Sequence, residues 1–156
     1  HTLRQLRAHI IHRRMNESDM TKKYILYIDG ASRGNPGPAG IGIVILDEKK
    51  KKVKELYKYI GKTTNNIAEY SALIYGLDEA AKLGANEVVV NMDSELVAKQ
   101  LNGEYKVKDP NIKAFFEKAA GVLKNFTNFE ITHIDRLKNK DADRLANKAI
   151  NLSALS

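Results

Sequence analysis

The chain has 156 residues, a formal net charge of +7 and an isoelectric point near 9.5. This length favours one domain with a substantial core, and the lack of cysteine excludes disulfides, a thiolate nucleophile and a cysteine zinc site. No apolar run approaches the ~18 residues of a membrane helix, and the N-terminus lacks the apolar stretch of a secretory signal. We therefore expect a cytoplasmic protein, most simply a monomer, with no membrane partner.

The positive charge suits a polyanionic partner, because neutralising phosphates supplies much of the affinity of proteins for nucleic acid. The lysine- and glutamate-rich surface of a thermophilic protein produces a similar composition. Charge alone therefore leaves both interpretations open.

Residues 1–20 differ in pattern from the rest of the chain. They carry four arginines, with Leu3, Leu6, Ile10 and Ile11 at roughly helical spacing. We interpret 1–20 as an N-terminal extension or an expression-derived segment, and 21–156 as one domain. A short basic helix that grips nucleic acid is the alternative for residues 1–20.

Three β-strands are predicted next, at residues 23–29, 41–46 and 53–60. The first is β-branched and aromatic and is expected to end at Gly30. A loop rich in glycine and proline separates it from the second strand, and a charged cluster at 47–52 forms the tip of the following hairpin. The three strands form an antiparallel meander.

A long helix is predicted over residues 65–82, with Gly84 placed to end it. Its buried face is expected to contain Ala68, Ala72, Leu73, Tyr75, Gly76, Leu77, Ala80 and Leu83. The remaining elements are a strand at 87–92, helices at 94–101 and 110–124, a strand at 129–134 and a helix at 140–151. The order βββαβααβα predicts an α/β fold with a mixed five-stranded sheet and helices on its faces.

Four carboxylates lie in four separate segments: Asp29 and Asp93 at strand ends, Glu69 on the long helix and Asp143 near the start of the last helix. Each has an ordinary alternative role. Asp29 could be a turn residue, Asp93 a helix N-cap, Asp143 a partner of the helix dipole and Glu69 a solvated charge. A cluster of acids is costly unless a cation neutralises it, and oxygen-only ligands suit Mg²⁺ or Mn²⁺.

The motifs around these acids resemble those of type 1 ribonuclease H. They are D-G-A-S-R-G-N-P-G-P-A-G, T-N-N-I-A-E, a strand ending in D-S, and N-K-D-A-D-R-L-A. Each motif is weak alone, but together they follow the family's order, and the resemblance covers about residues 24–152. It implies the ribonuclease H-like fold, in which the first three strands are antiparallel and the fourth and fifth run parallel to the first.

The resemblance implies an endonuclease that hydrolyses the RNA strand of RNA–DNA hybrids and leaves 5′-phosphate and 3′-hydroxyl ends. Asp29, Glu69, Asp93 and Asp143 would be both the catalytic residues and the ligands of two Mg²⁺ ions, with Mn²⁺ as the alternative ion. Asp29 would bridge the two ions, with Glu69 and Asp93 on one and Asp143 on the other. Double-stranded RNA is a second candidate substrate.

The resemblance also implies residues that bind the substrate: Gly30, Ala31, Ser32, Arg33, Asn35, Thr64, Asn65, Asn66 and Arg136. Such residues would read 2′-hydroxyls across the shallow minor groove or hold phosphates. Ordinary alternatives are helix capping for Asn65 and Asn66, a simple turn for 34–37, and an ion pair of Arg136 with Asp135 or Asp141.

Two departures from the best-known bacterial pattern concern substrate grip. No long basic protrusion follows Asp93, so Lys106, Lys108 or Arg136 would have to replace it. The loop before Asp143 is short and has no histidine, and His133 is expected to be a packed or half-exposed strand residue instead.

Three other functions remain as alternatives. One is a module of the same fold that holds hybrid or double-stranded RNA without cleaving it, although the four acids argue against a pure binder. Another is a related 3′–5′ exonuclease or a transposase-like nuclease, which the T-N-N-I-A-E and D-G-A-S-R-G-N-P-G-P motifs disfavour. The third is a simple electrostatic binder.

Overall fold

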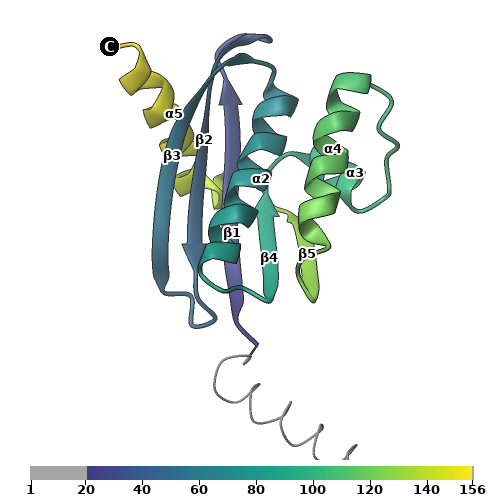
Figure 1. Ribbon diagram of the computed structural model, residues 1–156. Coiled ribbons are helices and arrows are strands. Elements are labelled where there is room, and N and C mark those ends of the chain that lie inside the picture. Colours follow the sequence, from purple (N-terminus) through teal and green to yellow (C-terminus); the bar gives the residue numbers. More distant parts are fainter. Residues whose placement is uncertain (1–20, 156) are drawn as a thin grey trace, which may run out of the picture.

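The computed structural model describes residues 21–155. Its centre is a five-stranded sheet in the spatial order β3-β2-β1-β4-β5 (Figure 1). The strands are β1 (Lys23–Ser32), β2 (Gly37–Leu46), β3 (Lys52–Thr63), β4 (Glu87–Met92) and β5 (Asn128–His133). β1, β2 and β3 pair in antiparallel fashion, and β4 and β5 run parallel to β1. The predicted mixed sheet is confirmed.

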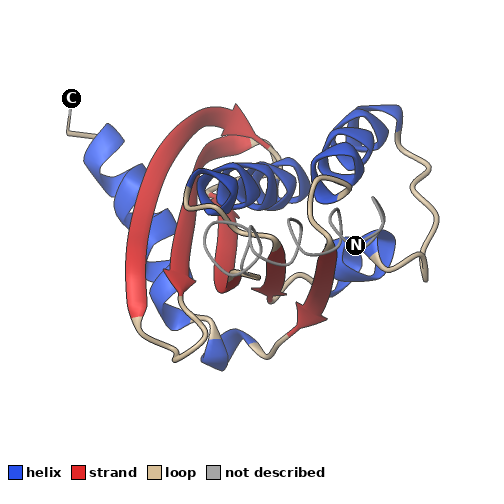
Figure 2. Ribbon diagram, turned by 60° about the horizontal axis from the view of Figure 1, so that its bottom comes forward, coloured by secondary structure: helices blue, strands red, loops and turns tan. Residues whose placement is uncertain are grey.

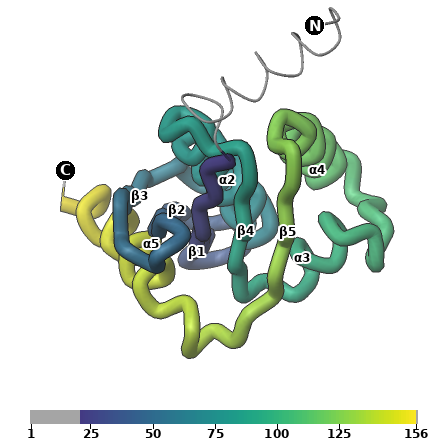
Figure 3. The backbone as a smooth tube through the Cα atoms, turned by 90° about the horizontal axis from the view of Figure 1, so that it is seen from below, coloured from purple at the N-terminus to yellow at the C-terminus, as the bar shows by residue number. Residues whose placement is uncertain are grey.

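Helices cover both faces of this sheet. They are α2 (Asn65–Lys82), α3 (Glu95–Leu101), α4 (Pro110–Leu123) and α5 (Lys140–Ser153), with a short 3₁₀ turn, η1 (Arg136–Lys138), before the last. Figures 1 and 2 show α2 and α4 on one face and α5 on the other. Figure 3 follows the connection from β5 to α5 as it passes from one edge of the sheet to the opposite face. Among the described residues, no helix is long and apolar enough to cross a membrane.

The main core lies between the sheet and α2. Leu26 and Ile28 of β1 and Ile43 of β2 are fully buried and pack in one cluster with Leu73 and Leu77 of α2. Each such side chain stabilises the fold by about 1.5–3 kcal/mol through removal from water. Apolar burial thus fixes α2 against the two central strands.

The ends of α2 follow from its sequence. The Thr64 hydroxyl accepts a hydrogen bond from the Ile67 amide at 3.3 Å, which satisfies a free donor of the first turn. At the other end Gly84 has a φ of +85°, the left-handed conformation that terminates helices. These two residues explain why the predicted range 65–82 is confirmed.

The prediction that Tyr75 belongs to the buried face of α2 is wrong. Tyr75 is exposed, and its hydroxyl and ring meet Lys58 of β3, whose amine lies 3.0 Å from the hydroxyl oxygen and 4.7 Å from the ring centroid. Tyr70 and Ile74 are buried in its place. The inward stripe of α2 is therefore rotated toward positions 70 and 74.

The first two strands are longer than predicted, and Gly30 does not end β1. The ladder between β1 and β2 continues through Gly30 opposite Ile41 to Ser32 opposite Ala39. The segment predicted as a glycine-rich loop therefore largely belongs to the sheet. The other boundaries lie within a few residues of prediction, and the interpretation of residues 1–20 falls outside the described residues.

Candidate active site

A cleft of about 460 Å³ opens at the carboxyl ends of β1 and β4. Asp29 lies on β1 and Asp93 directly follows β4, and these parallel strands are neighbours. The chain leaves β1 toward β2 on one side, whereas β4 lies on the other, so this edge is a topological switch point where open α/β sheets bind ligands. The cleft lining includes Asp29, Gly30, Ala31, Ser32, Arg33, Asn65, Asn66, Glu69, Asp93, Ser94, Arg136, Asp143 and Asn147.

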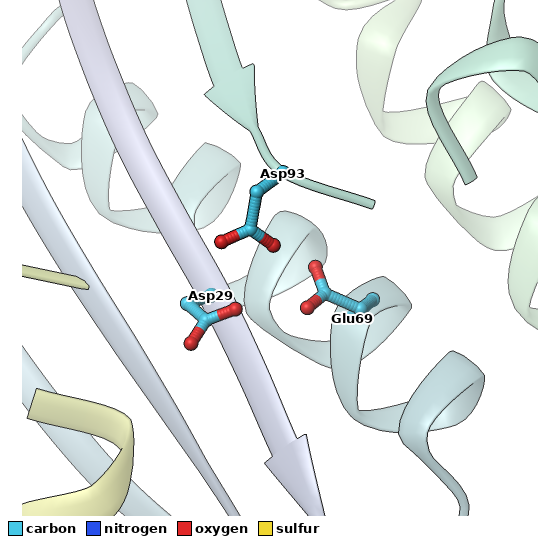
Figure 4. A group of neighbouring side chains, drawn as sticks. All are labelled: Asp29, Glu69 and Asp93. Carbon is cyan, nitrogen blue, oxygen red and sulfur yellow. The ribbon is translucent and has the colours of Figure 1, made fainter. Parts of the chain in front are cut away.

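Three carboxylates converge in the cleft. Asp29, Glu69 and Asp93 each offer an oxygen, and these atoms lie within 4.8 Å of one another. Figure 4 shows the three carboxylates turned toward a common centre from β1, α2 and the end of β4. Asp143 of α5 lines the same cleft and adds to the crowding of acids around Asp29. The structure therefore brings the four predicted acids to one place.

Glu69 is held by a close approach of α2 to β1. The Gly30 amide donates to Glu69 Oε1 at 3.1 Å. A Cβ added to Gly30 would lie 2.2 Å from the Ala68 carbonyl carbon, so only glycine permits this approach. The second oxygen, Oε2, is buried and has no hydrogen-bond partner among the described residues. A buried carboxylate oxygen without a donor is costly and suits an external cation.

The Asp93 carboxylate is available for metal binding because the neighbouring Ser94 caps the next helix. The predicted alternative was that Asp93 caps the following helix, but the Ser94 hydroxyl accepts from the Val97 amide and caps α3. Asn139 approaches Asp93 from the other side: its amide donates to the Ile28 carbonyl at 2.8 Å and lies 3.4 Å from Asp93 Oδ2. Asn139 thus ties the start of α5 to the two strands that carry Asp29 and Asp93.

Asp143 is positioned by the docking of α5 on β2. A Cβ on Gly42 would lie 2.1 Å from the Ala142 carbonyl oxygen, and one on Gly40 would lie 2.5 Å from that of Ala146. The two glycines therefore allow the backbone of α5 to touch the sheet. Arg136 NH2 lies 3.8 Å from Asp143 Oδ1, so Asp143 takes the place of the two acids predicted as its ion-pair partners.

The crowding of acids shifts their pKa values. Burial, followed by the charge and hydrogen bond of Glu69 and the charge of Asp93, raises the pKa of Asp29 far above its usual range. Burial also raises the pKa of Glu69, although hydrogen bonds from Asp29 and the Gly30 amide oppose the shift. Without a cation the fully ionised site is therefore unfavourable at neutral pH.

A pH dependence of stability follows from these shifts. A carboxyl whose pKa is higher in the folded than in the unfolded protein stabilises the fold at low pH and loses that contribution as the pH rises. In EDTA, we expect Asp29→Asn to gain stability over the wild type by about 2 kcal/mol between pH 5 and pH 8. Urea denaturation of both proteins across this range measures the difference. A difference that stays constant with pH would contradict the raised pKa of Asp29.

Most of the residues predicted to bind substrate line the cleft, and two do not. Asn35 instead accepts a hydrogen bond from the Asn65 amide at 3.1 Å, and Thr64 caps α2. The Asn65 side chain accepts from the Ser32 amide at 3.0 Å and so joins the start of α2 to the end of β1. The predicted capping alternative for Asn65 and Asn66 is wrong, because Thr64 is the cap.

Sequence reasoning missed Asn147, which lines the cleft one turn after Asp143 on α5. Its spacing of four residues from Asp143 was the available signal. His133 lies at the end of β5, as predicted, and is exposed and not packed. The predicted short connection after α3 is confirmed, and Lys106 and Lys108 in it are exposed.

The donor set fits a divalent metal ion. All four acids offer oxygen, the ligand type that Mg²⁺ and Mn²⁺ prefer, and Glu69 presents a buried oxygen that no donor of the described residues satisfies. Asp29, Glu69 and Asp93 could hold such an ion together. The fold and the site thus define an α/β protein of the ribonuclease H-like class with a carboxylate centre at the switch point of its sheet.

Comparison with known proteins identifies the family. Residues 27–149 match the family described as reverse transcriptase-like. The chain is 44% identical over 125 residues to Ribonuclease HI of Halobacterium salinarum, which covers 80% of this chain and 63% of that protein. It is also 44% identical to Bifunctional protein Rv2228c of Mycobacterium tuberculosis. The 135 aligned residues cover 86% of this chain and 37% of that protein.

A solved structure supports the same assignment. LC11-RNase H1, determined in complex with an RNA/DNA hybrid, superposes with a TM-score of 0.80 at 49% identity, over 85% of this chain and 99% of that one. The chain belongs to the type 1 ribonuclease H family, as its motifs predicted. It spans 63% or less of the length of the halobacterial and mycobacterial relatives.

Proposed function

We propose that this protein is an endonuclease that hydrolyses the RNA strand of RNA–DNA hybrids with the help of divalent metal ions. The observation that carries the proposal is the convergence of Asp29, Glu69 and Asp93 within 4.8 Å in an open cleft, with Asp143 beside them. Membership of the ribonuclease H family and the hybrid bound to LC11-RNase H1 support the choice of substrate.

The proposed cofactor is a pair of Mg²⁺ ions, with Mn²⁺ as the alternative. Asp29 would be shared, Glu69 and Asp93 would complete one site and Asp143 the other. Bound divalent ions supply Lewis acidity that activates water and stabilises the leaving oxygen, which gives 5′-phosphate and 3′-hydroxyl ends.

The chain's own contribution is to hold the four carboxylates close together although their negative charges repel one another. The Gly30 amide fixes one oxygen of Glu69 and leaves the other free. The Ser94 hydroxyl takes the capping role that would otherwise occupy Asp93, and Asn139 limits the movement of Asp93. These contacts form when the protein folds, so they would preorganise the acids before the substrate arrives.

The proposed substrate contacts lie along one wall of the cleft. The segment 30–33 at the end of β1 and the side chains of Asn65 and Asn66 would face 2′-hydroxyls and base edges, because amides both donate and accept. Arg136, whose side chain is 79% exposed and pairs only at 3.8 Å with Asp143, would reach a phosphate. Double-stranded RNA is the second candidate substrate, and the proposed setting is a monomer in the cytoplasm.

The test is cleavage of an end-labelled RNA strand annealed to DNA or to RNA, with Mg²⁺, Mn²⁺ or EDTA. We expect internal cuts in the hybrid that require a metal ion and that persist when both RNA ends are blocked. Mobility after phosphatase treatment identifies the 5′-phosphate. Tight binding of the hybrid without cuts in either metal would instead show a non-catalytic module, and loss of cutting on blocked ends would show an exonuclease.

A further inference from the structure

Asn147 contacts both Asp143 and Arg33 with its one side chain. It is half-buried in the cleft on α5. Its Nδ2 donates to the Asp143 carbonyl oxygen at 3.0 Å and lies 3.3 Å from Asp143 Oδ1. The donor side of the amide therefore faces one of the acids of the proposed metal site.

The acceptor side of the same amide faces Arg33. Arg33 Nη2 lies 3.3 Å from Asn147 Oδ1 and 3.5 Å from the Asn147 carbonyl oxygen, across 114 positions of sequence. Arg33 is exposed just after β1, at the rim of the cleft. The chain of contacts Arg33, Asn147 and Asp143 therefore joins the cleft rim to the carboxylate centre.

The Asn147 amide suits both neighbours, because it donates to Asp143 and accepts from Arg33. A carboxylate at position 147 would turn an oxygen toward Asp143 and repel it, whereas a hydroxyl would be too short to reach both groups. Among the described residues, Arg136 is the cation that forms an ion pair with Asp143, but their separation is 3.8 Å and the arginine side chain is 79% exposed. An exposed pair at that distance orients a carboxylate weakly.

We propose that Asn147 is a positioning residue, which sets the orientation of the Asp143 carboxylate for metal binding and couples it to the contact of Arg33 with nucleic acid. This inference rests on the proposed function for its substrate half. Its metal half depends only on the acids of the cleft. Arg33 held by Asn147 would dock a phosphate or sugar of the hybrid in fixed register with Asp143.

The experiment measures Mg²⁺ binding and catalysis separately. Two substitutions remove the amide: Asn147→Ala, which shortens the side chain, and Asn147→Leu, which keeps the number and branching of its heavy atoms. Isothermal titration of Mg²⁺ into each protein without nucleic acid is expected to show about tenfold weaker binding, the usual effect of losing a group that orients a metal ligand. The Mg²⁺ concentration for half-maximal cleavage should rise in parallel.

Asn151→Ala is the matched control, because Asn151 lies one turn further along α5 and is exposed. It makes the same chemical change in the same helix and should leave Mg²⁺ affinity and cleavage at wild-type values. Thermal unfolding of all variants shows whether the fold is retained. Wild-type Mg²⁺ affinity in both Asn147 variants would overturn the metal half of the proposal.

The coupling to Arg33 is tested by a double-mutant cycle in kcat/KM for the hybrid. Arg33→Ala alone is expected to raise KM, and its effect should shrink at least threefold in the Asn147→Ala background, because the link is already broken. Fully additive effects would overturn the coupling. If the wild type cleaves no hybrid but Mg²⁺ binding weakens as expected, the proposed function fails while the role of Asn147 at Asp143 stands.

Discussion

Asp29→Asn is expected to lower the rate of hybrid cleavage by about three orders of magnitude. Asp29 is the central acid of the cleft, since its carboxylate lies within 4.8 Å of those of Glu69 and Asp93 and shares the cleft with Asp143. An amide keeps the shape but loses the charge that would hold the cations, and several kcal/mol of charge stabilisation is worth about a thousandfold in rate. Single-turnover cleavage in saturating Mg²⁺ measures the effect.

Asp141→Asn is the control for this prediction. Asp141 is exposed in the first turn of α5, two residues before Asp143, where a negative charge interacts favourably with the helix dipole. Its neutralisation should change the cleavage rate less than about twofold and the free energy of unfolding by about 0.5 kcal/mol. Equal losses of activity in the two variants would mean that general negative charge, and not the acid cluster, supports the reaction.

Gly30→Ala is expected to destabilise the protein by about 3 kcal/mol and to remove most of its activity. The new methyl group would lie 2.2–2.4 Å from backbone atoms of Ala68 and Glu69, which cannot move without shifting α2. That shift would break the hydrogen bond from the amide of residue 30 to Glu69 and carry this acid away from Asp29. Urea denaturation and cleavage assays together measure both losses.

Gly121→Ala is the matched control for Gly30→Ala, and it is expected to stabilise the protein slightly where Gly30→Ala destabilises it. Gly121 lies inside α4, and an added Cβ would meet nothing within 4 Å. Alanine in a helix interior is more favourable than glycine by about 0.5–1 kcal/mol, so this variant should be slightly stabilised with unchanged activity. If Gly30→Ala behaved like Gly121→Ala, the tight contact of α2 with β1 would not be required for the site.

The parts of the fold that were predictable are those with local signals. The range of α2 follows from its cap Thr64 and its terminator Gly84, both of which act within a few residues. The extent of β1 and β2 was not predictable, because glycine is ordinarily a strand breaker. Gly30 and Gly42 remain in strands since helix backbones from distant segments pack directly on them, and this information lies in the tertiary structure.

The same distinction holds at the cleft. The four acids could be named from their motifs, and the structure brings them together. The roles of Asn35 and Ser94 could not be predicted. Several neighbouring polar side chains could have accepted from the Asn65 amide or capped α3, and the sequence does not distinguish among them. The spacing of four residues from Asp143 could have predicted Asn147, but its second partner, Arg33, is 114 residues away in sequence.

Because Asp143 reaches the cleft only when α5 docks on Gly40 and Gly42, the order of synthesis decides when the site can assemble. Chains emerge from the ribosome N-terminus first, at about 5–20 residues per second. Asp29, Glu69 and Asp93 therefore emerge well before Asp143, which is carried by the last helix of the described chain. A nascent chain still lacking α5 has three of the acids and an uncovered sheet face, so the complete cleft forms only after α5 has emerged from the ribosome. The order of synthesis thus makes Asp143 the last of the four acids to join the site.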